Sequence, residues 1–169
     1  MSSADVLYSP TDVAEAKQAW GANSGPAALA AILRRPVMTT SGYFPRFVSN
    51  RCVYPAHMRD AILVATKNEP DVTRVNAGSM GRVFPGRGVA CVQFHGPWDR
   101  KRSKGRGAAQ LKHAHWIATF ATVDGMMIYD ASVQQWLHMN DWLEDVLPPL
   151  MDDHKSGGWW CRMGYEVLS

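Results

Sequence analysis

The sequence has little of what marks several common protein classes. Its three cysteines, Cys52, Cys91 and Cys161, are odd in number and form no Cys-x-x-Cys pair, so neither a zinc site nor a full disulfide framework is indicated. We therefore expect no metal, no cofactor and a reducing compartment. No apolar run approaches the ~20 residues that span a bilayer, so a membrane partner is not expected.

The chain also lacks a recognisable export signal and a strong charge. Its first residues, MSSADVLYSP, have no basic start followed by an apolar run, which predicts a soluble protein that is cytoplasmic, or that leaves the cytoplasm by a route without a cleaved signal peptide. The 18 Lys and Arg residues against 15 Asp and Glu residues give a net charge of +3. This excess is too small to indicate a nucleic-acid or membrane partner.

The chain does have enough apolar residues for one core. A length of 169 residues, 46% of them hydrophobic, suits a single domain over residues 1–169 and is too short for two ordinary domains. The alanine-rich segment 24–33 predicts a buried helix, because small residues let other backbone approach closely and Pro36 disfavours continuation. A second helix is predicted over residues 55–66.

The second half of the chain is rich in β-branched and aromatic residues. The runs GVACVQFH, HWIATFATV and GMMIYDAS are separated by turn signals such as Asp124-Gly125, and the last two predict a β-hairpin. The segment NDWLEDVLPPL predicts a short helix that is capped by Asn140 and ends before the prolines, and WWCRMGYEVL predicts a final strand. Helices followed by an antiparallel sheet are the α+β pattern.

A basic loop interrupts the strands. Residues Arg100 to Arg106 hold five of the 18 basic residues, which predicts an exposed surface segment. Its charge is either simply solvated or a contact for an acidic partner. Nucleic-acid binding is disfavoured, because aromatic and basic residues are not regularly interleaved elsewhere in the chain.

Ser24 stands at the glycine-flanked start of the predicted alanine-rich helix. Unpaired backbone N–H groups and the helix dipole stabilise an anion there, so the position suits a nucleophile, a thiol above all, and the same N–H groups can serve an oxyanion hole. The alternative is structural, because serine is also a favoured helix N-cap.

Three other residues favour the chemical interpretation. His115 opens one run of the predicted hairpin and Asp130 closes the other, so the turn brings them side by side. The carboxylate can then orient the imidazole, and the imidazole can serve a nucleophile on the facing helix. Gln18 lies six residues before Ser24.

These segments resemble the papain-like cysteine peptidases, in particular the leader-peptide-cleaving peptidase domains of bacteriocin exporters and their stand-alone relatives. The matching stretches are Gln18, NSGPAALAAI, HWIATF and YDAS, 21 residues whose order spans most of the chain. The resemblance implies a papain-like fold, in which an N-terminal central helix packs on an antiparallel β-sheet, and a hydrolase that cleaves peptide or amide bonds in a peptide or protein substrate.

The resemblance also assigns roles. Ser24 takes the nucleophile position, His115 is the general base and acid, Asp130 orients it, and Gln18 donates to the oxyanion. The family has cysteine where this chain has Ser24, and a serine hydroxyl hardly ionises, so the chain with Ser24 is expected to be inactive. Either a cysteine has been exchanged for serine, or the scaffold has lost catalysis and kept binding.

Several further residues are candidates for lesser roles. His113 competes with His115 for the role of base, since it lies two residues earlier on the same strand face, whereas His57 and His95 are expected to be ordinary, partly buried histidines. The expected substrate contacts are Trp20, Asn23, Gly25 and Trp116. The alternative function is a non-catalytic peptide- or protein-binding module on the same fold, and acyl transfer to other acceptors would use the same residues.

Overall fold

The alanine-rich segment forms the predicted helix, α2 (Ser24–Leu33). In the computed structural model, which describes residues 7–47, 51–74, 84–99 and 110–167, every α2 residue from Gly25 to Ile32 is buried. Its alanines leave little distance between α2 and the sheet, since small side chains allow close approach. The helix ends at Arg34, which adopts a left-handed conformation with a φ of 58°, before Pro36.

Three further elements accompany α2 on the same side of the molecule. They are α1 (Val13–Trp20), the 3-10 helix η1 (Val37–Tyr43) and the predicted second helix, α4 (Pro55–Thr66). The Asp12 carboxylate accepts the amide hydrogens of Val37 and Met38, both at 2.9 Å, and so joins the start of α1 to the start of η1. Pro55 begins α4, where a missing N–H costs nothing.

The described strands form one antiparallel sheet. They are β1 (Val72–Arg74), β2 (Arg87–His95), β3 (Ala114–Thr122), β4 (Gly125–Asp130), β5 (Gln135–His138) and β6 (Gly158–Glu166), in the order β1-β6-β2-β3-β4-β5. The predicted hairpin is present as β3 and β4, and the predicted final strand as β6. The short 3-10 helix η2 (Pro97–Asp99) follows β2. The fold class is therefore α+β, as predicted.

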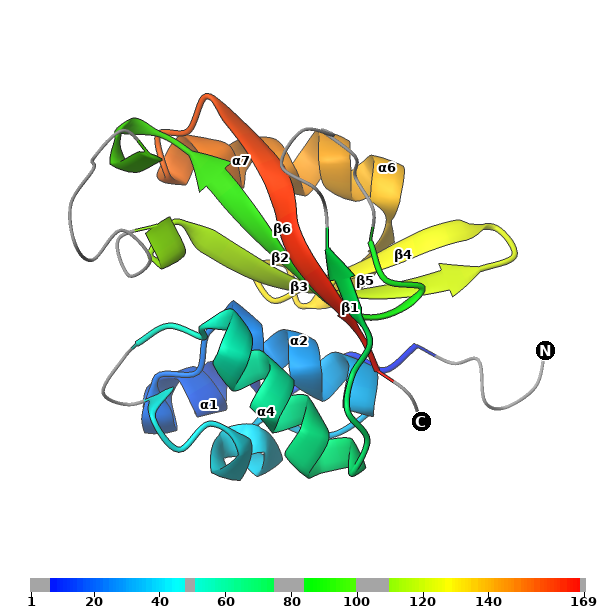
Figure 1. Cartoon of the computed structure of the whole chain (residues 1–169). Coiled ribbons are helices and arrows are strands. Elements are labelled where there is room, and N and C mark those ends of the chain that lie inside the picture. The colour runs from blue at the N-terminus through cyan, green and yellow to red at the C-terminus, as the bar shows by residue number, and fades with distance from the viewer. Residues whose placement is uncertain (1–6, 48–50, 75–83, 100–109, 168–169) are drawn as a thin grey trace.

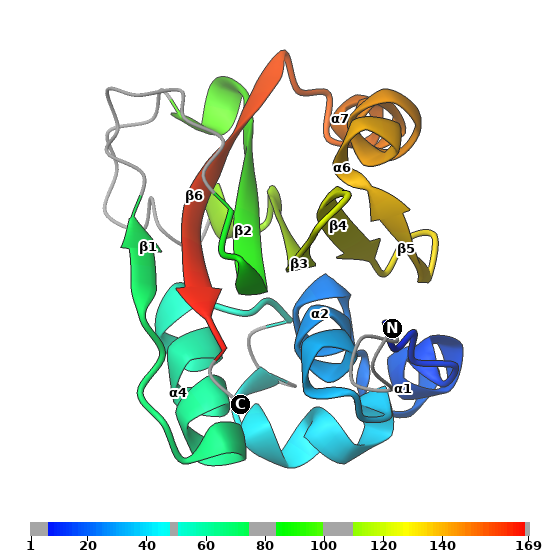
Figure 2. The ribbon, with the colours of Figure 1, turned by 90° about the vertical axis from the view of Figure 1, so that its right-hand side faces the viewer.

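The sheet carries a hydrophobic core on each face. Figure 1 shows α1, α2 and α4 on one face and the segment with α6 and α7 on the other, and Figure 2 shows the same layers from the side. Along β3, Trp116 and Ala118 belong to the core with α2, whereas Ile117 belongs to the opposite core. This alternation is the period of two of a strand.

The helical segment after β5 departs from the prediction. It runs through α6 (Met139–Asp141), the π-helical turn η3 (Trp142–Val146) and α7 (Leu147–Asp153), so the predicted end before the prolines is wrong. Asn140 lies inside α6 and is not its cap. The prolines occupy the first turn of α7, where their lack of an N–H is tolerated, and the wider turn before them accommodates their rings.

Two predictions about partners concern the basic loop, as a contact for an acidic partner, and the absence of a membrane partner. The basic loop Arg100 to Arg106 lies outside the described residues. Within the described ranges, no helix has the length and apolar character needed to cross a membrane.

Candidate active site

Ser24 is not the cap of its helix. The N-cap of α2 is Asn23, whose side-chain Oδ1 accepts the amide hydrogen of Gly25 at 3.0 Å, while Asn23 Nδ2 donates to the Arg51 carbonyl at 3.4 Å. The interpretation of Ser24 as an N-cap is therefore wrong, because an asparagine one residue earlier fills that role. Ser24 is the first residue of the helix, and its side chain is left for another contact.

That contact joins α2 to strand β3. Ser24 Oγ accepts the backbone amide hydrogen of Trp116 at 3.1 Å. Trp116 directly follows His115, so the Ser24 hydroxyl lies beside the peptide bond that links the two residues. The position predicted for the nucleophile thus contacts the backbone of β3 at the residue that follows the predicted base.

His115 and Asp130 form the predicted pair. The imidazole Nε2 lies 3.0 Å from both carboxylate oxygens of Asp130. The hairpin pairs Ala118 with Tyr129, so Asp130 continues opposite Ile117 and its side chain shares a face with His115 one step along the strand. Nε2 therefore donates to Asp130, and Nδ1 of His115 makes no hydrogen bond with any described residue.

Asp130 is held by more than the imidazole. Its carboxylate is fully buried and also accepts hydrogen bonds from Ser132 N at 2.8 Å, Ser132 Oγ at 2.7 Å and Trp142 Nε1 at 2.8 Å. Burial alone would raise the pKa of Asp130, but the charge of His115 and the hydrogen bonds from His115, Ser132 and Trp142 outweigh it and lower the pKa well below its ordinary value. Asp130 is therefore a fixed negative charge behind the imidazole.

The pair and Ser24 approach the sheet from opposite faces. The alternation of β3 places His115 with Ile117, on the face of Trp142, whereas Ser24 belongs to α2 on the other face. Accordingly, Ser24 Oγ contacts the backbone of β3, and among the described residues no hydrogen bond joins it to the His115 imidazole. The two sites meet at the beginning of β3, where His115 is the second residue of the strand and retains 11% of its side-chain exposure.

Gln18 and Trp20 lie in the last turn of α1. Gln18 is exposed and makes no hydrogen bond with a described residue, so its predicted orientation toward Ser24 stays a prediction. Trp20 packs edge-on against Phe47 with ring centroids 5.4 Å apart, and its buried Nε1 has no partner among the described residues.

A cavity of about 310 Å³ opens beside Ser24. It is lined by Asn23, Ser24, Arg51, Cys52, Val53, Leu111, Lys112, Ala114 and Trp116, and we call it the Ser24 cavity. Asn23 and Trp116, two of the predicted substrate contacts, line it, but Trp20 and Gly25 do not. Gly25 is buried, and its amide is already bound by the Asn23 cap, so its role is to provide space under Val53 and Trp116.

The remaining histidines have other partners. His113, the competing base, stacks on Trp98 with ring centroids 3.5 Å apart, and its Nδ1 lies 3.2 Å from Nδ1 of His154. It is therefore occupied on the side away from Ser24. His57 is partly buried, as expected, and packs edge-on against Tyr54 at 5.1 Å, whereas His95 is exposed and the expectation for it is wrong.

The thiols differ in environment. Burial raises the pKa of Cys91 to about 12 and that of Cys161 to about 11, so both are chemically quiet at neutral pH. Cys52 is half-buried and lines the Ser24 cavity.

Three residues of the site were missed by the sequence analysis. Ser132 had a local signal, because an aspartate often binds the backbone two residues on. Trp142 had none, because it approaches Asp130 from the following helical segment, at a π-helical turn, a feature that is frequent at functional sites. Val53 had none either, since it contacts Gly25 from 28 positions further along the chain.

In the described part of the chain, no group of three or more His, Cys, Asp or Glu side chains is arranged to hold a metal ion. No protein-family model matches the sequence, and no curated protein matches it.

Proposed function

We propose that this chain has a papain-like fold and is a cysteine-peptidase-like hydrolase of peptide or amide bonds, in which Ser24 replaces the nucleophilic cysteine. The observation that carries the proposal is the His115–Asp130 pair, with a fully buried carboxylate and four donors, at the point where β3 meets the first residue of α2. Nε2 of His115 is bound to Asp130, whereas its Nδ1 makes no hydrogen bond with a described residue and so is open to a proton donor.

The proposed reaction needs the His115 imidazole to reach residue 24 at the beginning of β3. A nucleophile at residue 24 attacks the substrate carbonyl carbon and transfers its proton to Nδ1 of His115, while Nε2–H stays bound to Asp130. The C–N bond then breaks, His115 returns the proton to the leaving amine, and a water activated by the same imidazole hydrolyses the acyl-enzyme.

The oxyanion has one main-chain donor available at the start of α2. The Gly25 amide is taken by Asn23, and Pro26 has no N–H. The amide of Ser24 itself donates to no described residue, and it points out of the positive end of the helix. A side-chain amide from Gln18 would be the second donor.

The alternative function is a peptide- or protein-binding module on the same fold. It is favoured by one observation: Ser24 Oγ accepts the Trp116 amide hydrogen at 3.1 Å and is not hydrogen-bonded to the imidazole. In that case the hydroxyl is a structural link between α2 and β3, and the Ser24 cavity binds a ligand without cleaving it.

Restoring a thiol tests the choice. The Ser24→Cys variant should react with iodoacetamide near neutral pH faster than Cys52, Cys91 or Cys161, because the helix N-terminus and an imidazolium both stabilise a thiolate. Labelling sites are assigned by peptide mass mapping.

The matched control replaces the base. With His115→Ala added, the rate at residue 24 should fall, since the ion pair that holds the thiolate is gone. A slow thiol that does not respond to His115→Ala would refute the hydrolase and leave the binding module, whereas cleavage of a peptide library by Ser24→Cys would establish the activity.

A further inference from the structure

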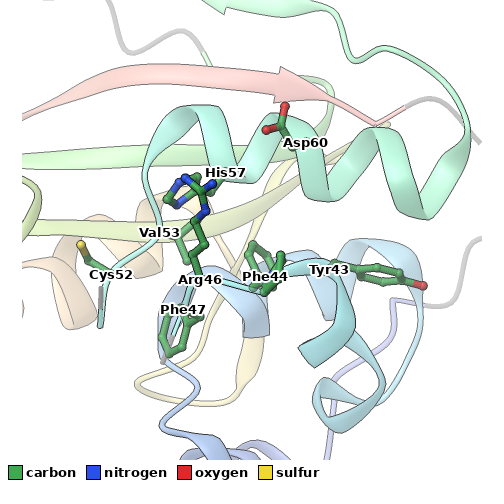
Figure 3. Close-up of a pocket in the computed structure, with 9 residues that line it drawn as sticks. Tyr43, Phe44, Arg46, Phe47, Cys52, Val53, His57 and Asp60 are labelled. Carbon is green, nitrogen blue, oxygen red and sulfur yellow. The ribbon is translucent and has the colours of Figure 1, made fainter. Parts of the chain in front are cut away.

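A second cavity shares a wall with the Ser24 cavity. It has a volume of about 280 Å³ and is lined by Tyr43, Phe44, Pro45, Arg46, Phe47, Cys52, Val53, His57 and Asp60 (Figure 3). We call it the aromatic pocket. Cys52 and Val53 line both cavities, so a ligand that fills one lies beside a ligand that fills the other.

The shared wall is fixed to the catalytic elements. Val53 is only 3% exposed, and its carbonyl accepts the indole hydrogen of Trp116 Nε1 at 3.0 Å. Its side chain also packs on the first turn of α2, so closely that a Cβ on Gly25 would lie 2.5 Å from Val53 Cγ2. The aromatic pocket is therefore held at a set position relative to Ser24 and β3.

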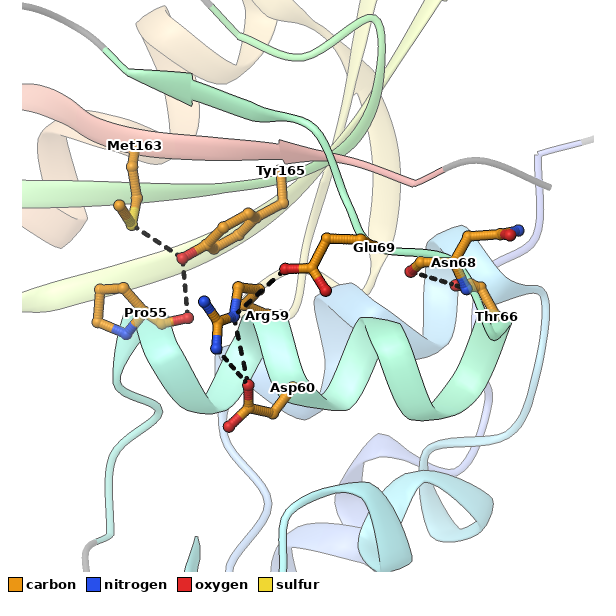
Figure 4. Close-up of polar contacts among 8 residues, drawn as sticks. All are labelled: Pro55, Arg59, Asp60, Thr66, Asn68, Glu69, Met163 and Tyr165. Carbon is orange, nitrogen blue, oxygen red and sulfur yellow. Dashed lines mark hydrogen bonds and ion pairs between the residues drawn. The ribbon is translucent and has the colours of Figure 1, made fainter.

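The lining favours an apolar occupant. Five of the nine lining residues are apolar or aromatic, namely Tyr43, Phe44, Pro45, Phe47 and Val53. The two residues with a full charge both have other contacts: Arg46 has an interaction of its own, and Arg59 Nη2 lies 3.1 Å from Asp60 Oδ1 (Figure 4). Tyr165 also anchors the start of this helix, since its hydroxyl donates to the Pro55 carbonyl at 2.9 Å. The volume lies just below the range of sites for drug-sized molecules, which suits a single large side chain.

We propose that the aromatic pocket is a specificity subsite that takes one large apolar side chain, such as phenylalanine or leucine, of a peptide whose main chain passes through the Ser24 cavity. This inference rests on the proposed function and adds the substrate class to it. The side chain belongs to a residue close to the bond that is cleaved, because the two cavities are separated only by the Cys52–Val53 wall. Burying such a side chain is expected to strengthen binding about 10- to 100-fold.

The test uses the Ser24→Cys variant and a series of N-acetyl-tripeptidyl chloromethyl ketones. One probe has three glycines, and three probes carry a single phenylalanine at each position in turn, so the contribution of one side chain is isolated. We expect one phenylalanine probe to alkylate residue 24 at least about 10-fold faster than the glycine probe. Equal rates for all four probes would overturn the inference.

Two variants with the same added ring provide the control. His57→Trp fills the aromatic pocket from α4, whereas Val64→Trp places the ring on the same helix at a position that is 50% exposed and outside the pocket. The phenylalanine preference should disappear with His57→Trp and persist with Val64→Trp, while iodoacetamide rates stay unchanged in both. A preference that survives His57→Trp would also overturn the inference.

A binding measurement separates failure of the subsite from failure of the hydrolase. If the introduced thiol is slow with iodoacetamide and insensitive to His115→Ala, the hydrolase fails, and the pocket is then judged on the chain with Ser24. Titration with N-acetyl-phenylalaninamide should shift the amide resonances of Phe47, Val53 and His57, and N-acetyl-alaninamide should not. Equal shifts with both compounds, or none, would overturn the pocket as an apolar site.

Discussion

Gly25→Ala tests whether the first turn of α2 is packed as tightly as its neighbours indicate. The added Cβ would lie 2.5 Å from Val53 Cγ2 and 2.9 Å from Val53 Cβ, whereas carbon atoms pack at about 3.5–4.0 Å, so Val53 must retreat by about 1 Å. Such overpacking costs about 1–3 kcal/mol, and replacing glycine by alanine in a helix offsets about 0.5–1 kcal/mol of it. We expect a net loss of about 1–2 kcal/mol, or roughly 2–8 °C in Tm for a chain of this size.

Thermal unfolding followed by circular dichroism measures this loss. The control is Gly42→Ala in η1, where an added Cβ meets nothing within 4 Å, and its free energy of unfolding should change by less than about 0.5 kcal/mol. If Gly25→Ala proved as stable as the parent chain, the wall formed by Val53 would be free to move. The argument that this wall fixes the aromatic pocket beside Ser24 would then be wrong.

Two further predictions concern pH. Asp130→Asn should lower the free energy of unfolding by about 1–3 kcal/mol at neutral pH, and the gap to the parent chain should narrow as pH falls below about 4. The reason is that a carboxyl whose pKa is lowered by folding stabilises the fold above its unfolded pKa and loses that effect in acid. For His154, burial first and then the charges of His113 and His115 lower the pKa, so the parent chain should lose stability as pH falls through about 6.5. His154→Phe should make that slope shallower. Urea midpoints across the pH range measure both effects. An Asp130→Asn gap that stays constant with pH would contradict the first argument, and equal slopes in His154→Phe and the parent chain would contradict the second.

The elements with long or well-marked patterns could be predicted from the sequence. α2 and α4 have the predicted bounds, and β3 and β4 form the predicted hairpin, because apolar periodicity and turn residues act locally. The edge strands β1 and β5, of three and four residues, are too short to carry a pattern. The π-helical turn was missed because its backbone responds to the packing of Trp142, which no local pattern encodes.

The candidate site divides in the same way. The His115–Asp130 contact was predictable because a hairpin aligns its two ends. The cap at Asn23 was not, since adjacent residues were both good caps and a boundary is uncertain by a residue. The shared wall of the two cavities depends on residues far from Ser24 in the sequence, and only the folded chain brings Val53 to Gly25.

Ser24→Ala and Ser24→Cys separate a structural hydroxyl from a vacated catalytic position. Ser24 Oγ accepts the Trp116 amide hydrogen in a partly buried setting, so alanine leaves that donor unsatisfied and should lower the free energy of unfolding by about 1–3 kcal/mol. A neutral thiol is a weak acceptor and regains little of this. A thiolate is a strong acceptor and also pairs with an imidazolium.

The difference between the two variants should therefore depend on pH. If folding lowers the thiol pKa at residue 24 below the unfolded value of about 8.5, the unfolded chain binds more protons between the two pKa values, and the stability of Ser24→Cys relative to Ser24→Ala rises with pH in that interval. Urea titrations of both variants between pH 5.5 and 8.5 measure the gap. A gap that stays constant over this range would mean that no thiolate forms at residue 24, and the contact with Trp116 would then be the whole function of the serine, as the binding-module alternative requires.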